Sequence, residues 1–161
     1  EKIEVYFDGA CEPVNPGGIA TYGFVVYRNH EKIHEDSGVA GAGCLGDDTS
    51  NNMAEYTALI KALEWLIESK LTETKIVVKG DSQLVIKQLN KQYAVKAPRI
   101  IPLYLKAQKL ASMFKDISFI WIPREQNKEA DTLSHKAYLD FCNKHKDFIK
   151  NTTREKQQAL N

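Results

Sequence analysis

The sequence has 161 residues, the length of one domain that can bury about two-thirds of the surface its unfolded chain would expose. Charged residues make up 27% of it and hydrophobic residues 43%, and no apolar run approaches the ~20 residues of a membrane span. Cys11, Cys44 and Cys142 are widely spaced and include no Cys-x-x-Cys pair, so neither a disulfide framework nor a zinc site is indicated. Because no export signal is recognisable either, we expect a soluble, reduced, cytoplasmic protein that does not bind a membrane.

The net charge is only +1, but the charges are separated along the chain. Residues 75–115 contain nine basic residues and a single acidic one, Asp81. We call the basic residues the basic block: Lys75, Lys79, Lys87, Lys91, Lys96, Arg99, Lys106, Lys109 and Lys115. Such a block favours a polyanionic partner on one face of the protein, although a solvated helical surface would have the same composition.

The first third of the chain is predicted to form strands, because apolar and polar residues alternate there. The predicted strands are residues 2–7, 19–28 and 31–39. Gly9 is expected to end the first strand, and a glycine-rich loop over residues 38–46 is expected to follow the third. The connections are too short to contain a helix, so we expect antiparallel pairing among the three.

Helical and strand patterns alternate in the rest of the chain. We predict helices at residues 52–69, 82–90, 103–114 and 127–143, and strands at residues 75–79 and 117–122. The order βββαβααβα predicts an α/β protein with a five-stranded mixed sheet flanked by helices. We assign residues 1–143 to this domain, and we expect residues 144–161, which have little to bury, to be a helical or partly disordered tail.

Four carboxylates occupy positions where the fold does not need them. Asp8 and Asp81 each follow a predicted strand, whereas Glu55 and Asp131 lie in predicted helices. Asp is common in turns, in helix caps and on surfaces, so each Asp taken alone has an ordinary structural explanation. Glu55 is harder to explain, because its helix face is otherwise apolar and a buried charge costs several kcal/mol unless a cation compensates it.

A fold that brings the four carboxylates together would create a site for divalent cations. Like-charged carboxylates at short range raise one another's pKa values until cations occupy the site. Ligands that are all oxygen select hard ions, hence Mg²⁺, with Mn²⁺ as a substitute. Two such ions about 4 Å apart can orient water for attack on a phosphodiester and stabilise the departing 3′ oxygen, which indicates hydrolytic phosphoryl transfer.

The residues around the four carboxylates, in this order along the chain, resemble those of type I ribonuclease H. They are Tyr-Phe-Asp-Gly-Ala at Asp8, Asn-Asn-Met-Ala-Glu-Tyr at Glu55, Gly-Asp-Ser-Gln-Leu-Val at Asp81 and Asn-Lys-Glu-Ala-Asp-Thr-Leu at Asp131. The resemblance covers residues 2–141 and implies the ribonuclease H-like fold. It also implies cleavage of the RNA strand of RNA/DNA hybrids with two metal ions, which leaves 5′-phosphate and 3′-hydroxyl ends.

The resemblance implies a role for each carboxylate. Asp8 would bind both metal ions. Glu55 and Asp81 would hold the ion near the leaving group, and Asp131 would hold the ion that activates water.

The resemblance also implies substrate contacts. Asn51 and Asn52 would read the minor groove of the hybrid and Ser50 would bind a DNA phosphate, although Ser50 and Asn51 are equally suited to cap a helix. We add Lys87 and Lys91 from the basic block. The expected substrate-binding residues are then Gly9, Ala10, Cys11, Ser50, Asn51, Asn52, Lys87 and Lys91.

The sequence departs from the family pattern at two places. It has no tryptophan-rich basic insertion within residues 92–103, so it resembles the compact members of the family. The loop before Asp131 has Arg124 where better-studied members have a histidine thought to assist proton transfer or product release. Guanidinium stays charged and cannot act as a base, so we expect Arg124 to be catalytic through its positive charge, unless it only pairs with Glu125 or Glu129.

The leading hypothesis is a monomeric, magnesium-dependent endonuclease whose partner is an RNA/DNA hybrid. Some compact relatives also cut duplex RNA, and the sequence leaves that substrate open. Two alternatives also stay open: another nuclease of the same fold, of the transposase or junction-resolvase type, and a hybrid-binding module with weak or no catalysis. Retention of all four carboxylates argues against the second alternative.

Overall fold

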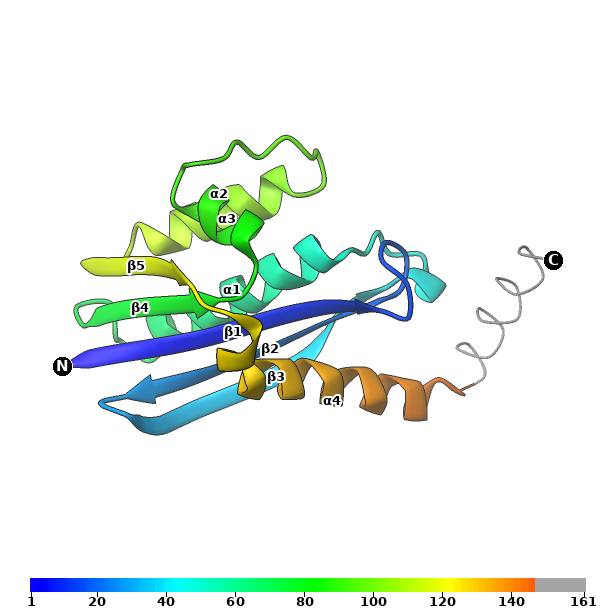
Figure 1. The fold of residues 1–161 in the computed structure, drawn as a ribbon, viewed down its shortest axis with the longest axis horizontal. Helices are drawn as coiled ribbons and strands as arrows, with labels where there is room; N and C mark the ends of the chain where they lie inside the picture. The colour runs from blue at the N-terminus through cyan, green and yellow to red at the C-terminus, as the bar shows by residue number, and fades with distance from the viewer. Residues whose placement is uncertain (147–161) are drawn as a thin grey trace.

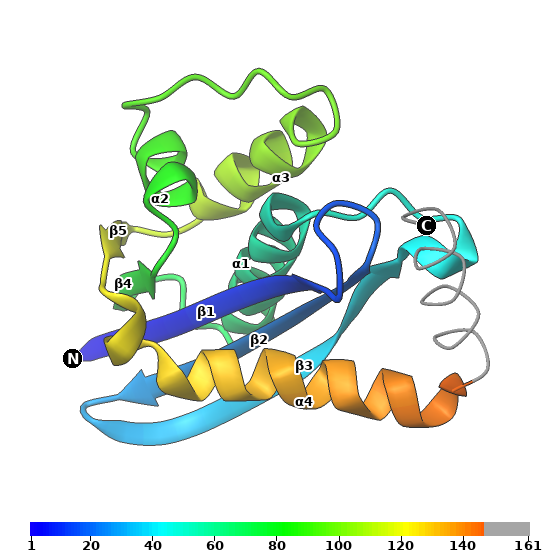
Figure 2. The same cartoon turned by 45° about the vertical axis from the view of Figure 1, so that its right-hand side comes forward.

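The computed structural model describes residues 1–146 as a five-stranded sheet with helices on both faces (Figures 1 and 2). The strands are β1 (Lys2–Glu12), β2 (Ile19–Arg28), β3 (Glu31–Ala42), β4 (Lys75–Gly80) and β5 (Asp116–Trp121). The helices are α1 (Asn51–Glu68), α2 (Gln83–Leu89), α3 (Ile101–Ala111) and α4 (Lys128–Lys144), with short 3-10 turns η1 (Gly43–Leu45) and η2 (Arg124–Gln126). The predicted order of elements is confirmed. None of the helices within residues 1–146 is long and apolar enough to cross a bilayer.

The strand order is β3-β2-β1-β4-β5, which places β1 at the centre of the sheet. β1 pairs antiparallel with β2, and β2 with β3, whereas β1–β4 and β4–β5 are parallel, so the sheet is mixed as predicted. α1 packs across one face on β1 and β2, with α3 against it, and α4 packs on the opposite face along β1, β2 and β3 (Figure 2). The side chains of β1 therefore alternate between the two helical layers.

The main apolar core lies between the sheet and α1. Phe7 of β1 and Phe24 of β2 contact the apolar stripe of α1, which includes Leu59 and Leu63, and all four side chains are almost fully buried. Burial of these large side chains stabilises the contact of α1 with β1 by several kcal/mol in total. This contact determines where the first turns of α1 lie relative to β1.

β1 is longer than predicted, because Gly9 does not end it. Gly9 pairs with Tyr22 of β2, and the ladder continues to Glu12. A Cβ atom on residue 9 would lie 2.2 Å from the backbone carbon of Ala54, so glycine is required here for the close approach of α1 and not to break the strand. Asp8 consequently lies inside a strand and not in a turn.

Two other boundaries differ from the prediction for physical reasons. β3 extends to Ala42, so the first part of the predicted glycine-rich loop is strand paired with β2. α3 begins at Ile101 because Pro102 lies in the first helical turn, where a backbone N–H has no partner within the helix. Of the predicted tail, residues 144–161, only residues 144–146 lie within the described part of the chain.

Candidate active site

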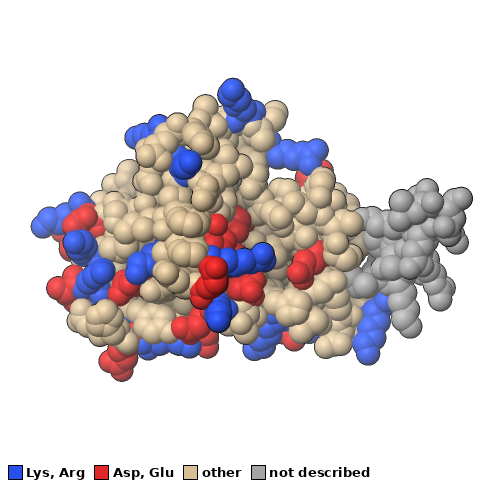
Figure 3. Space-filling model, in the orientation of Figure 1, with Lys and Arg blue, Asp and Glu red and all other residues tan. Residues whose placement is uncertain are grey.

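The four carboxylates predicted from the sequence line one pocket of about 420 Å³. One oxygen atom each of Asp8, Glu55 and Asp81 lie within 4.8 Å of one another. Asp131 lines the same pocket, and its charge acts on the carboxyl group of Asp8. In Figure 3, acidic side chains gather near the centre of the face, where β1 meets the beginning of α4. The fold therefore joins four residues that are distant along the chain.

Asp8 and Asp81 are brought together by the parallel pairing of β1 and β4. Phe7 pairs with Gly80, so the residue that follows each lies at the same level of the sheet. Ser82 caps α2 by accepting a hydrogen bond from the Val85 N–H at 3.2 Å. Asp81 is thus not the helix cap, and its carboxylate is directed to the pocket.

Glu55 reaches the pocket because α1 touches β1 at Gly9. A Cβ on Gly9 would also lie 2.4 Å from the Glu55 nitrogen, so no other residue would let the helix approach this closely. Glu55 is 6% exposed, and its Oε2 atom is buried without a hydrogen-bond partner among residues 1–146. An unpaired buried carboxylate oxygen beside two other carboxylates is what a divalent cation would satisfy, so these residues fit a hard metal ion.

Burial raises the pKa values of the clustered carboxyl groups. The pKa of Asp8 is raised from 3.8 to about 8, first by burial and then by the charges of Asp81 and Asp131. The pKa of Glu55 is raised well above its usual value by burial, and then by Asp8 and Asp81. Without cations the pocket therefore retains protons near neutral pH, and a bound cation would displace them.

Asn127 supports the pocket from behind and was not predicted from the sequence. Its side-chain amide donates hydrogen bonds to the carbonyl of Phe7 at 2.9 Å and to the Asp81 carboxylate at 3.1 Å. Its own backbone carbonyl accepts the Asp131 N–H at 3.1 Å. Asn127 is 1% exposed and therefore links three of the segments that carry carboxylates. In the sequence it opens the phrase around Asp131 and precedes a helix, and only its tertiary contacts reveal this role.

Arg124 lies in η2 and lines the acidic pocket, the position that a catalytic cation would need. The alternative of a pair with Glu129 is not seen, because Glu129 instead forms an ion pair with Lys32 at 2.9 Å. Among residues 1–146, Arg124 forms no ion pair within 4.0 Å. Its charge is thus available to the pocket.

The predicted substrate residues near Glu55 also take structural roles. Ser50 caps α1 by accepting the Met53 N–H at 3.1 Å, and the Asn51 side chain accepts the Cys11 N–H at 2.8 Å. Asn51, Asn52 and residues 9–11 all line the acidic pocket, whereas Ser50 does not. The structure therefore places most of this predicted set beside the carboxylates.

Comparison with known proteins decides the family. A family model described as reverse transcriptase-like matches residues 7–137. The chain belongs to that family. A crystal structure of RNase H1 from Halobacterium salinarum is 34% identical, with a TM-score of 0.76 over 87% of this chain and 99% of that one. LC11-RNase H1 in complex with an RNA/DNA hybrid is 34% identical, with a TM-score of 0.75 over 84% of this chain and 95% of that one. The fold is that of type I ribonuclease H, as the resemblance implied.

Some relatives of this member of the reverse transcriptase-like family are much longer. The bifunctional protein Rv2228c of Mycobacterium tuberculosis is 37% identical over 137 residues, which is 84% of this chain but 35% of that protein. The chain thus spans about a third of the length of the first curated relatives that it matches.

The basic block of this family member does not form one uninterrupted surface. Lys79 pairs with Glu4 at 2.5 Å, Arg99 with Asp48 at 3.6 Å and Lys106 with Glu64 at 3.7 Å. Lys87 in α2 is half-buried and Lys91 in the following turn is exposed, and neither lines the acidic pocket. Carboxylates therefore offset the charge of the three paired residues, and Lys87 and Lys91 stay candidates for binding.

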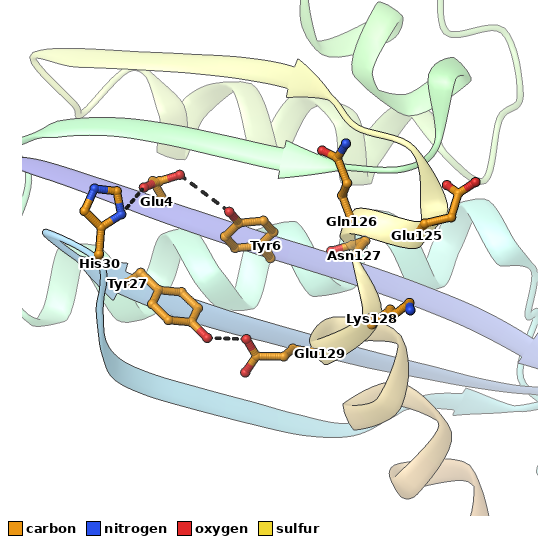
Figure 4. A pocket seen from close by; sticks show the side chains of 9 residues that line it. All are labelled: Glu4, Tyr6, Tyr27, His30, Glu125, Gln126, Asn127, Lys128 and Glu129. Carbon is orange, nitrogen blue, oxygen red and sulfur yellow. Dashed lines mark hydrogen bonds and ion pairs between the residues drawn. The ribbon is translucent and has the colours of Figure 1, made fainter.

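A larger hollow of about 520 Å³ lies on the part of the sheet that α4 leaves open (Figure 4). Tyr6 and Tyr27 pack edge to face with ring centres 6.0 Å apart. Lys79 donates a hydrogen bond to Glu4 and lowers the pKa of that carboxyl group, and Tyr27 and Lys32 lower the pKa of Glu129. Glu4 and Glu129 are already paired with donors or cations, and the three carboxylates Glu4, Glu125 and Glu129 make this hollow unsuited to phosphate.

Proposed function

We propose that this chain is a ribonuclease H that hydrolyses the RNA strand of RNA/DNA hybrids in the acidic pocket. The observation that carries the proposal is the convergence of Asp8, Glu55 and Asp81 within 4.8 Å, with Arg124 and Asp131 lining the same pocket. The chain shares 34% identity and its fold with LC11-RNase H1, which was solved with an RNA/DNA hybrid, and this supports the same substrate class.

The carboxylates would hold two Mg²⁺ ions, for which Mn²⁺ would substitute in the reaction mixture. Asp8 would contact both ions, Glu55 and Asp81 one of them, and Asp131 the other. When bound, such ions supply positive charge at the scissile phosphate and lower the pKa of a water molecule. All other contributions come from side chains and backbone groups of the chain.

The chain itself positions the substrate and balances charge. Asn51 and Asn52 offer amide donors and acceptors beside the carboxylates, suited to the minor-groove edge of a hybrid duplex. Arg124 places a permanent positive charge where negative charge develops on the phosphate. The oxygen of water forms the new P–O bond and the P–O3′ bond breaks, so the products carry a 5′-phosphate and a 3′-hydroxyl.

We also propose that the enzyme acts as a monomer. All four carboxylates and Arg124 come from a single chain, and Asn127 holds three of their segments together within that chain. A second copy is not needed to complete the site. Sedimentation of the active enzyme at assay concentration tests this point.

The test of function is cleavage of a labelled RNA strand paired with DNA, compared with the same RNA paired with RNA and with a DNA duplex of the same sequence. In Mg²⁺ we expect cleavage of the hybrid with 5′-phosphate ends, no cleavage of duplex DNA, and no reaction in EDTA. The duplex RNA sample decides whether that substrate is also used. A parent protein that leaves the hybrid intact in both Mg²⁺ and Mn²⁺, while the Asp8→Asn variant behaves identically, would overturn the proposal.

A further inference from the structure

A smaller hollow of about 160 Å³ lies next to the acidic pocket and is lined by Gln83, Lys87 and Trp121. Gln83 directly follows Ser82, which lines the acidic pocket, so the two hollows are adjacent along the chain. The indole N–H of Trp121 donates a hydrogen bond to the backbone carbonyl of Asp81 at 3.0 Å. A single hydrogen bond thus joins this hollow to the segment that carries one of the clustered carboxylates.

Trp121 is exposed but firmly held. It is the last residue of β5, where it pairs with Gly80, and its ring nitrogen is tied to Asp81. The side-chain amide of Asn90 donates to the carbonyl of Phe119 at 3.0 Å and so fastens the end of α2 to β5. Trp121 nevertheless stays 42% exposed. A large aromatic ring that is fixed in place and left open to solvent is suited to receive an apolar surface of a partner.

The charge beside this ring is positive. Lys87 lines the hollow, and its ammonium lies 3.3 Å from the Tyr93 hydroxyl and 4.9 Å from the centre of the Tyr93 ring. No carboxylate lines the hollow, and within residues 1–146 no ion pair neutralises Lys87. This distinguishes it from the hollow of Figure 4, which is lined by Glu4, Glu125 and Glu129 and would repel phosphate.

Resting on the function proposed above, we propose that Trp121 and Lys87 form a subsite for one nucleotide of the substrate strand, beside the nucleotide that is cut. The ribose ring packs on the indole, and a flanking phosphate pairs with the Lys87 ammonium. Neither contact involves a base edge, so the subsite acts on every sequence and positions the strand without reading it. Its place next to Asp81 lets it set where the strand enters the acidic pocket.

The two tryptophans of the chain make the subsite directly observable. Trp65 is stacked on His34 with ring centres 4.2 Å apart, away from both hollows, so Trp65→Phe leaves Trp121 as the single fluorescent reporter. In an Asp8→Asn background, which prevents cleavage, we expect a short RNA/DNA hybrid in Mg²⁺ to reduce acrylamide quenching of Trp121 about threefold or more. The matched Trp121→Phe variant reports only on Trp65 and should show no change. Trp121 that stays equally open to acrylamide in the saturated complex overturns the proposal.

The hybrid affinities of variants distinguish a contact with the Trp121 ring from an effect of the Trp121–Asp81 hydrogen bond. Trp121→Ala should weaken hybrid binding about three- to thirtyfold at every salt concentration, because apolar contact area is lost and no charge changes. Lys87→Ala should reduce the slope of log affinity against log salt by about one. Trp121→Phe keeps a ring without the N–H and should bind close to the parent, as should Leu105→Ala, which removes an exposed side chain on α3. If Phe binds as weakly as Ala, the Asp81 hydrogen bond is responsible and the ring contact is rejected.

Failure of this subsite is distinguishable from failure of the proposed function. Hybrid cleavage by the unaltered chain tests the function alone, because it needs no change at Trp121 or Lys87. A chain that cleaves hybrids but whose Trp121→Ala variant binds them with parental affinity keeps its function and loses the subsite.

Discussion

The side-chain amide of Asn127 donates to the Asp81 carboxylate at 3.1 Å and, at the same time, to the carbonyl of Phe7, the residue before Asp8. Both partners of the NH₂ group are acceptors, so the orientation of the amide is determined. The hydrogen bond occupies one oxygen of Asp81 and leaves its other oxygen for a metal ion. Asn127, which does not itself line the acidic pocket, thus aligns one of the proposed metal ligands.

We predict that Asn127→Asp lowers hybrid cleavage at least about a hundredfold, because a second carboxylate would face the Asp81 oxygen and repel it. Asn127→Ala adds no charge beside Asp81, but it should destabilise the fold by about 1–3 kcal/mol, because buried acceptors lose their donor. The readout is the Mg²⁺ concentration at half-maximal rate together with the melting temperature. A purely structural role would lower the melting temperature of both variants and leave the Mg²⁺ requirement unchanged.

The raised pKa values predict an unusual pH dependence of stability in the absence of metal. Because the pKa of Asp8 is about 8 in the folded protein and 3.8 ordinarily, the folded state binds more protons than the unfolded state between about pH 4 and pH 8. The free energy of unfolding in EDTA should therefore fall as pH rises through this range. Mg²⁺ should restore stability at pH 8 but not at pH 5, where protons compete.

Melting temperatures in EDTA and in Mg²⁺ across pH 5 to 8 check this, and Asp8→Asn should flatten the EDTA curve. A melting temperature that rises with pH in EDTA would show that other groups dominate the titration.

Arg124→Ala should lower kcat by roughly ten- to a thousandfold, because a fixed cation near a developing anion supplies a few kcal/mol. Arg124→Lys should restore part of this loss. Arg124→His should be active only when the imidazole is protonated, so the pH profile of its rate should show an inflection near pH 6.5, whereas the parent shows no such inflection from this position. Lys136→Ala, on the exposed surface of α4, is the matched control. Parental kcat for Arg124→Ala at saturating hybrid would leave the residue without a catalytic role.

Charge reversal at Lys87, Lys91 and Lys96 together should weaken hybrid binding for all sequences and flatten its salt dependence, because each phosphate contact contributes a slope of about one. Lys91 and Lys96 are exposed and Lys87 is half-buried, and none of the three is among the paired residues of the basic block. Reversal at Lys136 and Lys144, two exposed lysines on α4, provides a control that also makes the chain more acidic. An unchanged salt slope would mean that the three lysines face solvent in the complex.

The order of elements could be predicted from the sequence because periodicity is local, and the four carboxylates could be predicted from the apolar surroundings of Glu55 together with the family phrases around all four. Periodicity distinguishes strands from helices, and Glu55 stands out as a charge on an apolar helix face. Gly9 was misjudged because its role depends on the backbone of Ala54, which belongs to a different element. A glycine in a strand pattern indicates either a break or a close approach, and only the packing partner decides which.

Longer-range relationships could not be read from composition. Lys79 lies in a basic stretch, yet its partner Glu4 comes from the neighbouring strand, and Arg99 pairs with Asp48 from before α1. Asn127 only opens the phrase around Asp131 and Trp121 lies in none of the quoted phrases, and each gains its role from a hydrogen bond to Asp81. The sequence does show that the two residues flank Arg124: Trp121 ends β5 and Asn127 directly precedes α4.

The most direct test of the central claim measures melting temperature and hybrid cleavage together on Asp8→Asn and Glu55→Gln, with Asp140→Asn on the exposed surface of α4 as the control. If the acidic cluster is a catalytic metal site, both variants should melt at or above the parent temperature in EDTA at pH 8, because repulsion is relieved, while cleavage in Mg²⁺ falls by several orders of magnitude. The control should match the parent in both. Parental cleavage by either Asp8→Asn or Glu55→Gln would contradict the claim.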